Sequence, residues 1–249
     1  MTIPSLSAAG KVVVITGGSR GLGRAMTLGF AEAGADVVVS SRKLEPCEKV
    51  AAEARAFGRR ALAFGCHVGD WEQCNALVEE TVSTFGRIDV LVNNAGIAPV
   101  PPSLLGVSED LFDRTIAVNL RGPLRLTALA AEHMPSGGAV VNVSSKASLH
   151  PSPYTVVYAA AKAGLNALTK AAALEFAPRG IRVNAIVCGT FHTDSLHTSL
   201  STAELQEQMA SRVALRRIAE PEEIVGTALY LASDASSYLT GELILLDGG

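Results

Sequence analysis

A short apolar run, a glycine-rich segment, a helical pattern and a second apolar run follow one another near the start of the chain. The first run, Lys11–Thr16, is rich in β-branched residues, which is typical of a strand covered on both faces of a sheet. Gly17–Gly23 follows at once, then a helical pattern over Arg24–Ala33 and a second apolar run at Asp36–Ser40. Strand, glycine turn, helix and strand in this order predict the βαβ unit that binds dinucleotides.

Glycines in such a turn have a physical role in phosphate binding. They let the backbone turn tightly and approach a pyrophosphate, which then lies at the N-terminus of the following helix. An ordinary glycine-rich turn is the alternative, but the flanking strand and helix favour phosphate binding. The residues expected to contact the dinucleotide here are Gly17, Ser19, Arg20, Gly21, Leu22 and Gly23.

The end of the second strand bears on which cofactor fits. An acidic side chain there would bond the ribose of NAD, whereas an arginine accommodates the 2′-phosphate of NADP. The sequence has Ser41, Arg42 and Lys43, with no carboxylate before Glu45, and Arg20 adds a cation nearby. A guanidinium suits a phosphate because its donors form a fork. We therefore expect NADP(H), with NAD(H) as the alternative; the cations could also simply begin a solvated helix.

Composition excludes several other classes of protein. The chain has 249 residues, 48% of them hydrophobic, and a net charge of −3, so it has no basic field for nucleic acid or anionic lipid. No apolar run reaches the ~20 residues of a membrane span, and the N-terminus shows no signal-peptide pattern. Four scattered cysteines form no C-x-x-C pair, which favours reduced thiols and no metal site: Cys47, Cys66, Cys74 and Cys188. We expect one cytoplasmic domain over residues 1–249.

Tyr158 and Lys162 stand four residues apart in an alanine-rich helical pattern that continues to Phe176. Residues with this spacing share a helix face. A cation beside a phenol favours the phenolate and lowers its pKa, which makes a tyrosine useful for moving protons. On its own the pair could equally be two side chains on a solvated face.

Three motifs together extend this interpretation. The first is Thr16-Gly17-x-x-x-Gly21-x-Gly23, the second is Asn93-Asn94-Ala95-Gly96, and the third is the Tyr158/Lys162 pair. In content and order they resemble the short-chain dehydrogenase/reductase family, and specifically its members similar to 3-oxoacyl-acyl-carrier-protein reductase. The resemblance runs from about Lys11 to Gly249.

The resemblance implies an α/β fold, a doubly wound Rossmann fold whose seven-stranded parallel sheet has helices on both faces. Seven apolar runs alternate with helical patterns, as such a sheet requires. A long helix is expected over Ser108–His133 and a last major helix at Pro221. The expected strands are Lys11–Thr16, Asp36–Ser40, Ala61–Val68, Ile88–Val92, Ala139–Val143, Ile181–Val187 and Leu243–Leu246.

The resemblance also implies a set of catalytic residues. By position alone, Ser144 and Ser145 are equally suited, since both end a predicted strand; the family's serine lies thirteen positions before the tyrosine, which is Ser145. Tyr158 would transfer the proton and Lys162 would hold the ribose and lower the pKa of the phenol. Asn119 would position a water in the proton relay.

Further cofactor contacts follow from the same resemblance, with two departures from the family pattern. The family commonly has an aspartate where this chain has His67, and a proline where it has Cys188. Asp70 is better placed to cap the helix that starts at Trp71. The remaining expected contacts with the cofactor are Ser41, Arg42, Val68, Asn94, Ala95, Gly96, Tyr158, Lys162, Gly189 and Thr193.

The implied activity is NAD(P)-dependent interconversion of a carbonyl and a secondary alcohol. A lid over a small-molecule substrate is expected at about residues 190–212, and a homo-oligomer, tetramer or dimer, is expected as well. A non-catalytic dinucleotide-binding sensor is the alternative, because a fold alone does not determine function. The identity of the substrate does not follow from these motifs.

Overall fold

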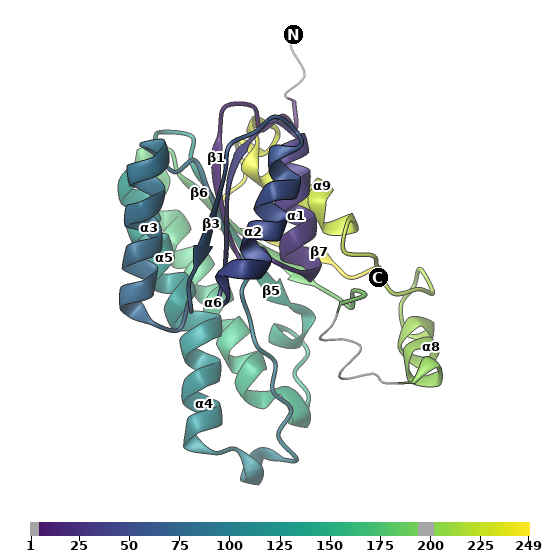
Figure 1. Cartoon of the computed structure of the whole chain (residues 1–249). Coiled ribbons are helices and arrows are strands. Elements are labelled where there is room, and N and C mark those ends of the chain that lie inside the picture. Colours follow the sequence, from purple (N-terminus) through teal and green to yellow (C-terminus); the bar gives the residue numbers. More distant parts are fainter. Residues whose placement is uncertain (1–4, 194–201) are drawn as a thin grey trace.

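A seven-stranded parallel sheet forms the centre of the computed structural model, which describes residues 5–193 and 202–249 (Figure 1). The strands lie in the order β3-β2-β1-β4-β5-β6-β7, so the order reverses between β1 and β4. This confirms the expected doubly wound sheet. The strands are β1 Val12–Thr16, β2 Asp36–Ser41, β3 Ala61–Gly65, β4 Val90–Asn93, β5 Ala139–Ser145, β6 Arg182–Cys188 and β7 Leu243–Leu246.

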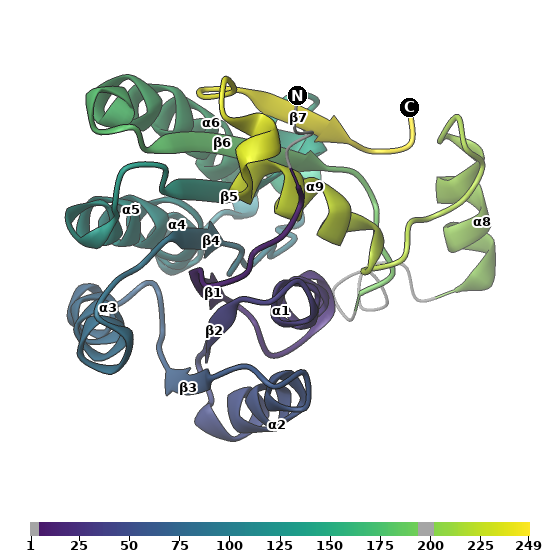
Figure 2. The same ribbon diagram turned by 90° about the horizontal axis from the view of Figure 1, so that it is seen from above.

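Helices cover both faces of the sheet (Figure 2). One face carries α1 (Gly21–Glu32), α2 (Leu44–Arg55) and α9 (Glu223–Ala232). The other carries α3 (Trp71–Phe85), α4 (Glu109–Ile116), α5 (Gly122–His133) and α6 (Val156–Phe176), and α8 (Ala203–Ser211) stands away from the sheet. Short helical turns complete the described chain at Leu104–Gly106, Ala117–Arg121, Lys146–Ser148, Pro153–Thr155, Ala177–Arg179 and Asp234–Ser236.

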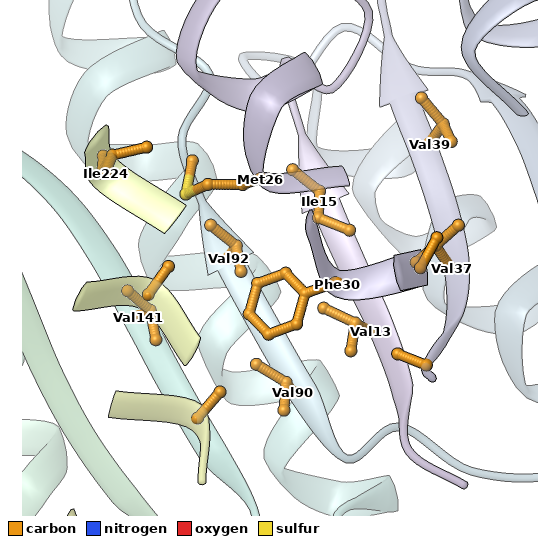
Figure 3. Close-up of a cluster of buried hydrophobic side chains, with 14 of the residues drawn as sticks. Val13, Ile15, Met26, Phe30, Val37, Val39, Val90, Val92, Val141 and Ile224 are labelled. Carbon is orange, nitrogen blue, oxygen red and sulfur yellow. The ribbon is translucent and has the colours of Figure 1, made fainter. Parts of the chain in front are cut away.

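Two apolar clusters, one on each face, explain why the strands read as nearly continuous hydrophobic runs. Val13 and Ile15 of β1 point to the cluster beneath α1, whereas Val14 belongs to the cluster on the opposite face. Phe30 of α1 is fully buried against valines of β1, β2 and β4 (Figure 3). Because both faces are covered, each strand needs apolar residues at successive positions.

Buried polar side chains connect the central strands to the helices on one face. Asn93 of β4 and Asn142 of β5 are register partners, and Asn93 Nδ2 donates to Asn142 Oδ1 at 2.9 Å. Asn93 Nδ2 also donates to Thr127 of α5 at 3.1 Å, and Asn142 Nδ2 donates to Thr169 of α6 at 2.9 Å. Buried amides carry a large cost when unpaired, so these bonds favour one register of the strands that carry the site.

The helical region expected over Ser108–His133 is confirmed, since helical residues run without a gap from Glu109 to His133. It is divided into α4, a π-helical turn at Ala117–Arg121, and α5. Pro123 has no backbone N–H to donate to the carbonyl of Asn119 four residues earlier, so a regular α-helical turn would leave that carbonyl unpaired. The last helix also begins later than expected, at Glu223, two residues after Pro221.

Phe30→Ala should lower the free energy of unfolding by about 3–5 kcal/mol, since it leaves a cavity among side chains that cannot fully collapse. Urea denaturation followed by circular dichroism measures the change. Phe57→Ala is the matched control because Phe57 is 46% exposed, and it should cost much less. Equal losses in the two variants would contradict this description of the core.

Candidate functional site

The glycine turn lies at the point where the strand order reverses, and the segment after β4 supports it. Asn94 Nδ2 donates to the carbonyl of Thr16 at 2.8 Å and to that of Gly17 at 3.3 Å. The backbone N–H groups of Asn94 and Ala95 donate to Thr16 Oγ1 at 3.0 and 3.1 Å. Two of the expected motifs, the turn after β1 and the Asn94–Gly96 segment, are therefore brought together. Ligands of doubly wound sheets bind at this crevice.

Two glycines of the turn are required by their surroundings. Gly17 has a φ of +66°, where side chains are strained, and a Cβ there would lie 2.8 Å from Asn94 Nδ2. A Cβ on Gly23 would lie 2.1 Å from the carbonyl oxygen of Gly17. The turn and the first turn of α1 thus pack backbone against backbone, which leaves the N-terminus of α1 open to an approaching ligand.

The N-terminus of α1 suits an anion. The Arg20 side chain makes no capping hydrogen bond, and the first turn holds no acidic residue. By contrast, Asp70 caps α3 by accepting from the N–H groups of Glu72 and Gln73, as expected. The first N–H groups of an uncapped helix attract negative charge. These residues therefore fit the pyrophosphate of a dinucleotide, with Ser19 and Leu22 in the same turn.

Other expected cofactor residues surround this turn. A Cβ on Gly21 would lie 3.4 Å from Thr193 Cγ2, so Thr193, after β6, lies beside the turn. A Cβ on Gly96 would lie 2.9 Å from Asn119 Oδ1 and 3.7 Å from Lys162 Nζ, which places Gly96 between those two side chains. The glycine turn and the Lys162 region therefore border one crevice.

The end of β2 carries exposed positive charge. Arg42 and Lys43 are both exposed there, and the first carboxylate of α2, Glu45, pairs with Lys49 at 2.7 Å. The Ser41 hydroxyl is bound within its own turn, since it donates to the carbonyl of Lys43 at 3.2 Å and lies 3.0 Å from Cys47 Sγ. A phosphate at this strand end would meet Arg42 and no carboxylate of β2.

The segment after β3 is held by its own hydrogen bonds. His67 N donates to Gln73 Oε1 at 2.8 Å, and His67 Nδ1 accepts from Gly69 N at 3.2 Å. Val68 is 7% exposed and packs into the cluster below α3 and α5. His67 is hydrogen bonded within its own segment, and the Val68 side chain faces the core. A cofactor at this segment would therefore meet backbone atoms, where the family commonly has an aspartate side chain.

The structure separates the two candidate serines. Ser144 is 2% exposed, and its hydroxyl donates to Asn166 Oδ1 at 2.7 Å. Ser145 is half-buried, and its hydroxyl lies beside the phenol of Tyr158, whose pKa it lowers. The hydroxyl of Ser144 is therefore occupied by Asn166, which leaves Ser145 as the serine beside the tyrosine.

Lys162 is buried at the centre of the site. It is 3% exposed, its Nζ donates to the carbonyl of Val143 at 2.7 Å, and it lies 5.8 Å from the ring centroid of Tyr158. Burial lowers the pKa of Lys162 to about 8.

The expected lowering of the Tyr158 pKa is not found in this structure. Burial raises the pKa of Tyr158, the hydrogen bond with Ser145 lowers it, and the charge of the Cys188 thiolate would raise it. The cost of removing a phenolate from water is the largest of these effects, and the nearby Lys162 does not offset it.

Asn119 lies in the π-helical turn and is fully buried. Its Nδ2 donates to the carbonyls of Ile97 at 2.8 Å and Thr115 at 2.9 Å, and its Oδ1 accepts from Ile97 N at 3.3 Å. Both N–H donors of the side chain are therefore used within the protein. A water held at this residue would bind the backbone carbonyl, which Pro123 leaves without an α-helical donor.

Cys188 and Gly189 end β6 beside the serine. Cys188 is the register partner of Ser145, and burial raises the pKa of its thiol to about 12. Such a thiol stays protonated and is a poor nucleophile. Gly189 needs its missing side chain, because a Cβ would lie 2.6 Å from Asp247 Cα.

Sequence reasoning missed Asn166, which connects α6 to the serine turn. Its Nδ2 donates to Ser148 Oγ at 2.9 Å, and Ser148 Oγ donates to the carbonyl of Ser145 at 2.6 Å. The available signal was its position four residues after Lys162, on the same helix face.

Of the expected lid at 190–212, residues 194–201 lie outside the described residues, and α8 forms most of the rest.

A doubly wound sheet with an anion-binding glycine turn, beside a tyrosine, a serine and a buried lysine, defines a nicotinamide-dependent oxidoreductase. Comparison with known proteins agrees. The family model described as enoyl-(acyl carrier protein) reductase matches residues 17–249. The chain belongs to the short-chain dehydrogenase/reductase family, and it interconverts a carbonyl and an alcohol with NAD(P).

Three similar proteins illustrate the relationship. An L-rhamnose 1-dehydrogenase (NAD(P)(+)) from Azotobacter vinelandii is 40% identical, with 96% of each chain covered. A 3-oxoacyl-[acyl-carrier-protein] reductase from Thermotoga maritima is 40% identical, over 96% of this chain and 97% of the relative. A short chain dehydrogenase from Burkholderia cenocepacia, solved in complex with NADP, has a TM-score of 0.91 at 32% identity, over 97% and 98% of the two chains.

Two further observations concern the described residues alone. None of their helices is both long enough and apolar enough to cross a membrane. Within the same residues, no group of three or more His, Cys, Asp or Glu side chains could hold a metal ion.

Gly23→Ala should weaken dinucleotide binding by about ten- to a hundredfold, because the Gly17 carbonyl must move out of its place in the turn. Titration of NADPH followed by its fluorescence measures the affinity. Gly226→Ala in α9 is the control, since a Cβ there meets no atom within 4 Å. Unchanged affinity in Gly23→Ala would contradict the assignment of this turn.

Lys162→Met should stabilise the cofactor-free protein at pH 7 by about 3 kcal/mol, since the pKa of Lys162 is about 8 in the folded protein and 10.5 for an ordinary lysine. Between these values the unfolded state binds more protons, so wild-type stability rises with pH and the advantage of methionine shrinks. Denaturation at pH 7 and pH 10 measures both effects. Lys170→Met, exposed on the same helix, should show neither; a pH-independent difference for Lys162→Met would contradict the burial argument.

Proposed function

We propose that residues 1–249 form one cytoplasmic catalytic domain, an NADP(H)-preferring short-chain dehydrogenase/reductase. Its catalytic residues are Asn119, Ser145, Tyr158 and Lys162. The observation that carries this proposal is the burial of Lys162 at the carboxyl end of β5, where its Nζ donates to the carbonyl of Val143 and lies 5.8 Å from the ring centroid of Tyr158, with Ser145 beside the same phenol. A hydroxyl pair of this kind can hold and protonate one carbonyl oxygen.

In the reductive direction, Tyr158 donates its proton to the carbonyl oxygen of the substrate while Ser145 donates a hydrogen bond to the same oxygen. A nicotinamide cofactor, when bound, would supply the hydride to the carbonyl carbon. Lys162 is largely an ammonium at neutral pH, given its pKa of about 8, and it holds the ribose and stabilises the phenolate that Tyr158 leaves behind. The backbone carbonyl of Asn119 holds the water that returns a proton to the site.

The preference for NADP(H) rests on charge. Arg42 is exposed at the end of β2 and Arg20 lies in the glycine turn, while β2 ends without a carboxylate. The Azotobacter relative is named for NAD(P)(+), and the Burkholderia structure contains NADP, so both cofactors occur among similar proteins. We infer that Arg42 contacts the 2′-phosphate.

The substrate is a small carbonyl compound or secondary alcohol. The similar proteins are named for a sugar and for a 3-oxoacyl thioester, and we extend to this chain only the carbonyl or secondary alcohol that both share. Residues 190–212 would lie over this substrate. Large exposed apolar side chains, including Leu105 at 98% and Leu174 at 81%, support a homo-oligomer, a tetramer or a dimer.

Tyr158→Phe should lower kcat by at least about a hundredfold, in line with general acid–base contributions of ~10²–10⁴. A panel of ketones and alcohols followed at the nicotinamide absorbance measures the rate. The control is Tyr238→Phe, because Tyr238 is fully exposed and should be dispensable. Undiminished turnover in Tyr158→Phe would remove the acid/base assignment.

Arg42→Ala should weaken NADP(H) binding by about tenfold and leave NAD(H) binding almost unchanged, since only the 2′-phosphate loses a partner. Fluorescence titration of the two reduced cofactors gives the ratio. Arg114→Ala in α4, another exposed arginine, should change neither affinity. Equal losses for both cofactors would contradict the assigned role of Arg42.

A further inference from the structure

The carboxyl ends of three neighbouring strands form a row beside the catalytic serine. Ser145 of β5 is the register partner of Cys188 of β6, and Cys188 is the partner of Leu246 of β7. The next residue in each strand is Lys146, Gly189 and Asp247 respectively. These three residues therefore lie side by side, with the glycine in the middle.

An ion pair crosses this row. Lys146 Nζ lies 2.6 Å from Asp247 Oδ2, and the aspartate side chain is only 6% exposed. Strands two places apart in a sheet are separated by about 10 Å. The two side chains close that distance over Gly189, whose missing side chain leaves room: a Cβ there would lie 2.6 Å from Asp247 Cα. The aspartate end of this contact is thus held within the fold, whereas the Lys146 side chain is 43% exposed.

Lys146 begins the short turn that orients the serine. Within Lys146–Ser148, the N–H of Ala147 donates to Ser145 Oγ at 3.2 Å. Asn166 holds the turn toward α6 through Ser148, and Asp247 holds its other end toward β7. The direction of the Ser145 hydroxyl therefore depends on where these two anchors place the turn.

The second oxygen of Asp247 holds the last residues of the chain. Gly249 N donates to Asp247 Oδ1 at 3.2 Å. The carbonyls of Gly248 and Gly249 accept from the N–H groups of Leu215 and Ala214 at 3.1 and 3.3 Å. One carboxylate thus contacts both the serine turn and the segment that packs against residues 214–215.

We propose that Lys146 and Asp247 are a positioning pair, whose ion pair fixes the 146–148 turn so that the Ser145 hydroxyl faces Tyr158. Neither side chain touches the reacting atoms. The inference rests on the proposed function, because positioning matters only if Ser145 takes part in the reaction.

The test compares kcat, the KM of NADPH and thermal unfolding in Lys146→Met, Asp247→Asn, the double variant and Lys146→Arg. Each single loss should lower kcat by about tenfold, the size expected for one charge-assisted hydrogen bond, and leave the KM of NADPH unchanged. The double variant should be no slower than either single one, because both remove the same contact. Lys146→Arg should retain most of the activity.

The pH profile separates positioning from a general loss of structure. In alcohol oxidation the phenolate of Tyr158 accepts the proton, so the rate rises with pH through the pKa of Tyr158. The groups that face this phenol are Ser145, Lys162 and Cys188, and all three are retained. The contact with Ser145 lowers the pKa of Tyr158. Weakening this contact should therefore raise the pKa of Tyr158 and move the pH profile to higher pH. Lys49→Met, which breaks an exposed pair on α2, should move neither kcat nor the profile.

Three results would overturn the positioning role and leave the proposed function intact. The single variants could keep the wild-type kcat, or the losses could add in the double variant. The third result is a slower rate that partial unfolding at the assay temperature explains. An unmoved pH profile would also overturn it. A wild-type protein that turns over none of the substrates would overturn the proposed function first, and the positioning role with it.

Discussion

The parallel register of the sheet is the constraint on which the site depends. Because all seven strands run the same way, their carboxyl ends meet at one edge, and residues distant in sequence become neighbours there. Two residues of this edge end their strands, Thr16 and Ser145. Three others directly follow a strand, namely Asn94, Gly189 and Asp247. The buried amides of β4 and β5 favour this register, since a slip by one residue would turn each side chain to the opposite face.

Burial shapes the chemistry of this edge more than any single pair of charges. It lowers the pKa of Lys162 to about 8, raises that of Cys188 to about 12 and raises that of Tyr158. The buried ammonium of Lys162 lowers the free energy of unfolding, so this site makes the protein less stable than an apolar side chain at the same position would. Against this effect of burial, the neighbouring Ser145 hydroxyl lowers the pKa of Tyr158.

Much of this arrangement could be predicted from local sequence. The strand runs, the glycine turn and the Asp70 cap depend on neighbouring residues, whereas the choice of Ser145 over Ser144 came from the resemblance to the family. The π-helical turn that holds Asn119 precedes Pro123, a local signal that the helical pattern concealed. The pKa of Tyr158 depends on the burial of its ring, and the contact of Lys146 with Asp247 joins residues a hundred positions apart. Neither can be obtained without the packed fold.

The central claim is that this edge of the sheet brings a dinucleotide and a carbonyl compound together for hydride transfer. The most direct measurement uses NADPH deuterated at C4 with a panel of ketones, followed by mass spectrometry of the products. We predict that an alcohol forms with one deuterium on the carbinol carbon, and that none is incorporated there from deuterated solvent. Binding of the cofactor without any deuterated alcohol would contradict the claim and indicate a non-catalytic dinucleotide-binding protein.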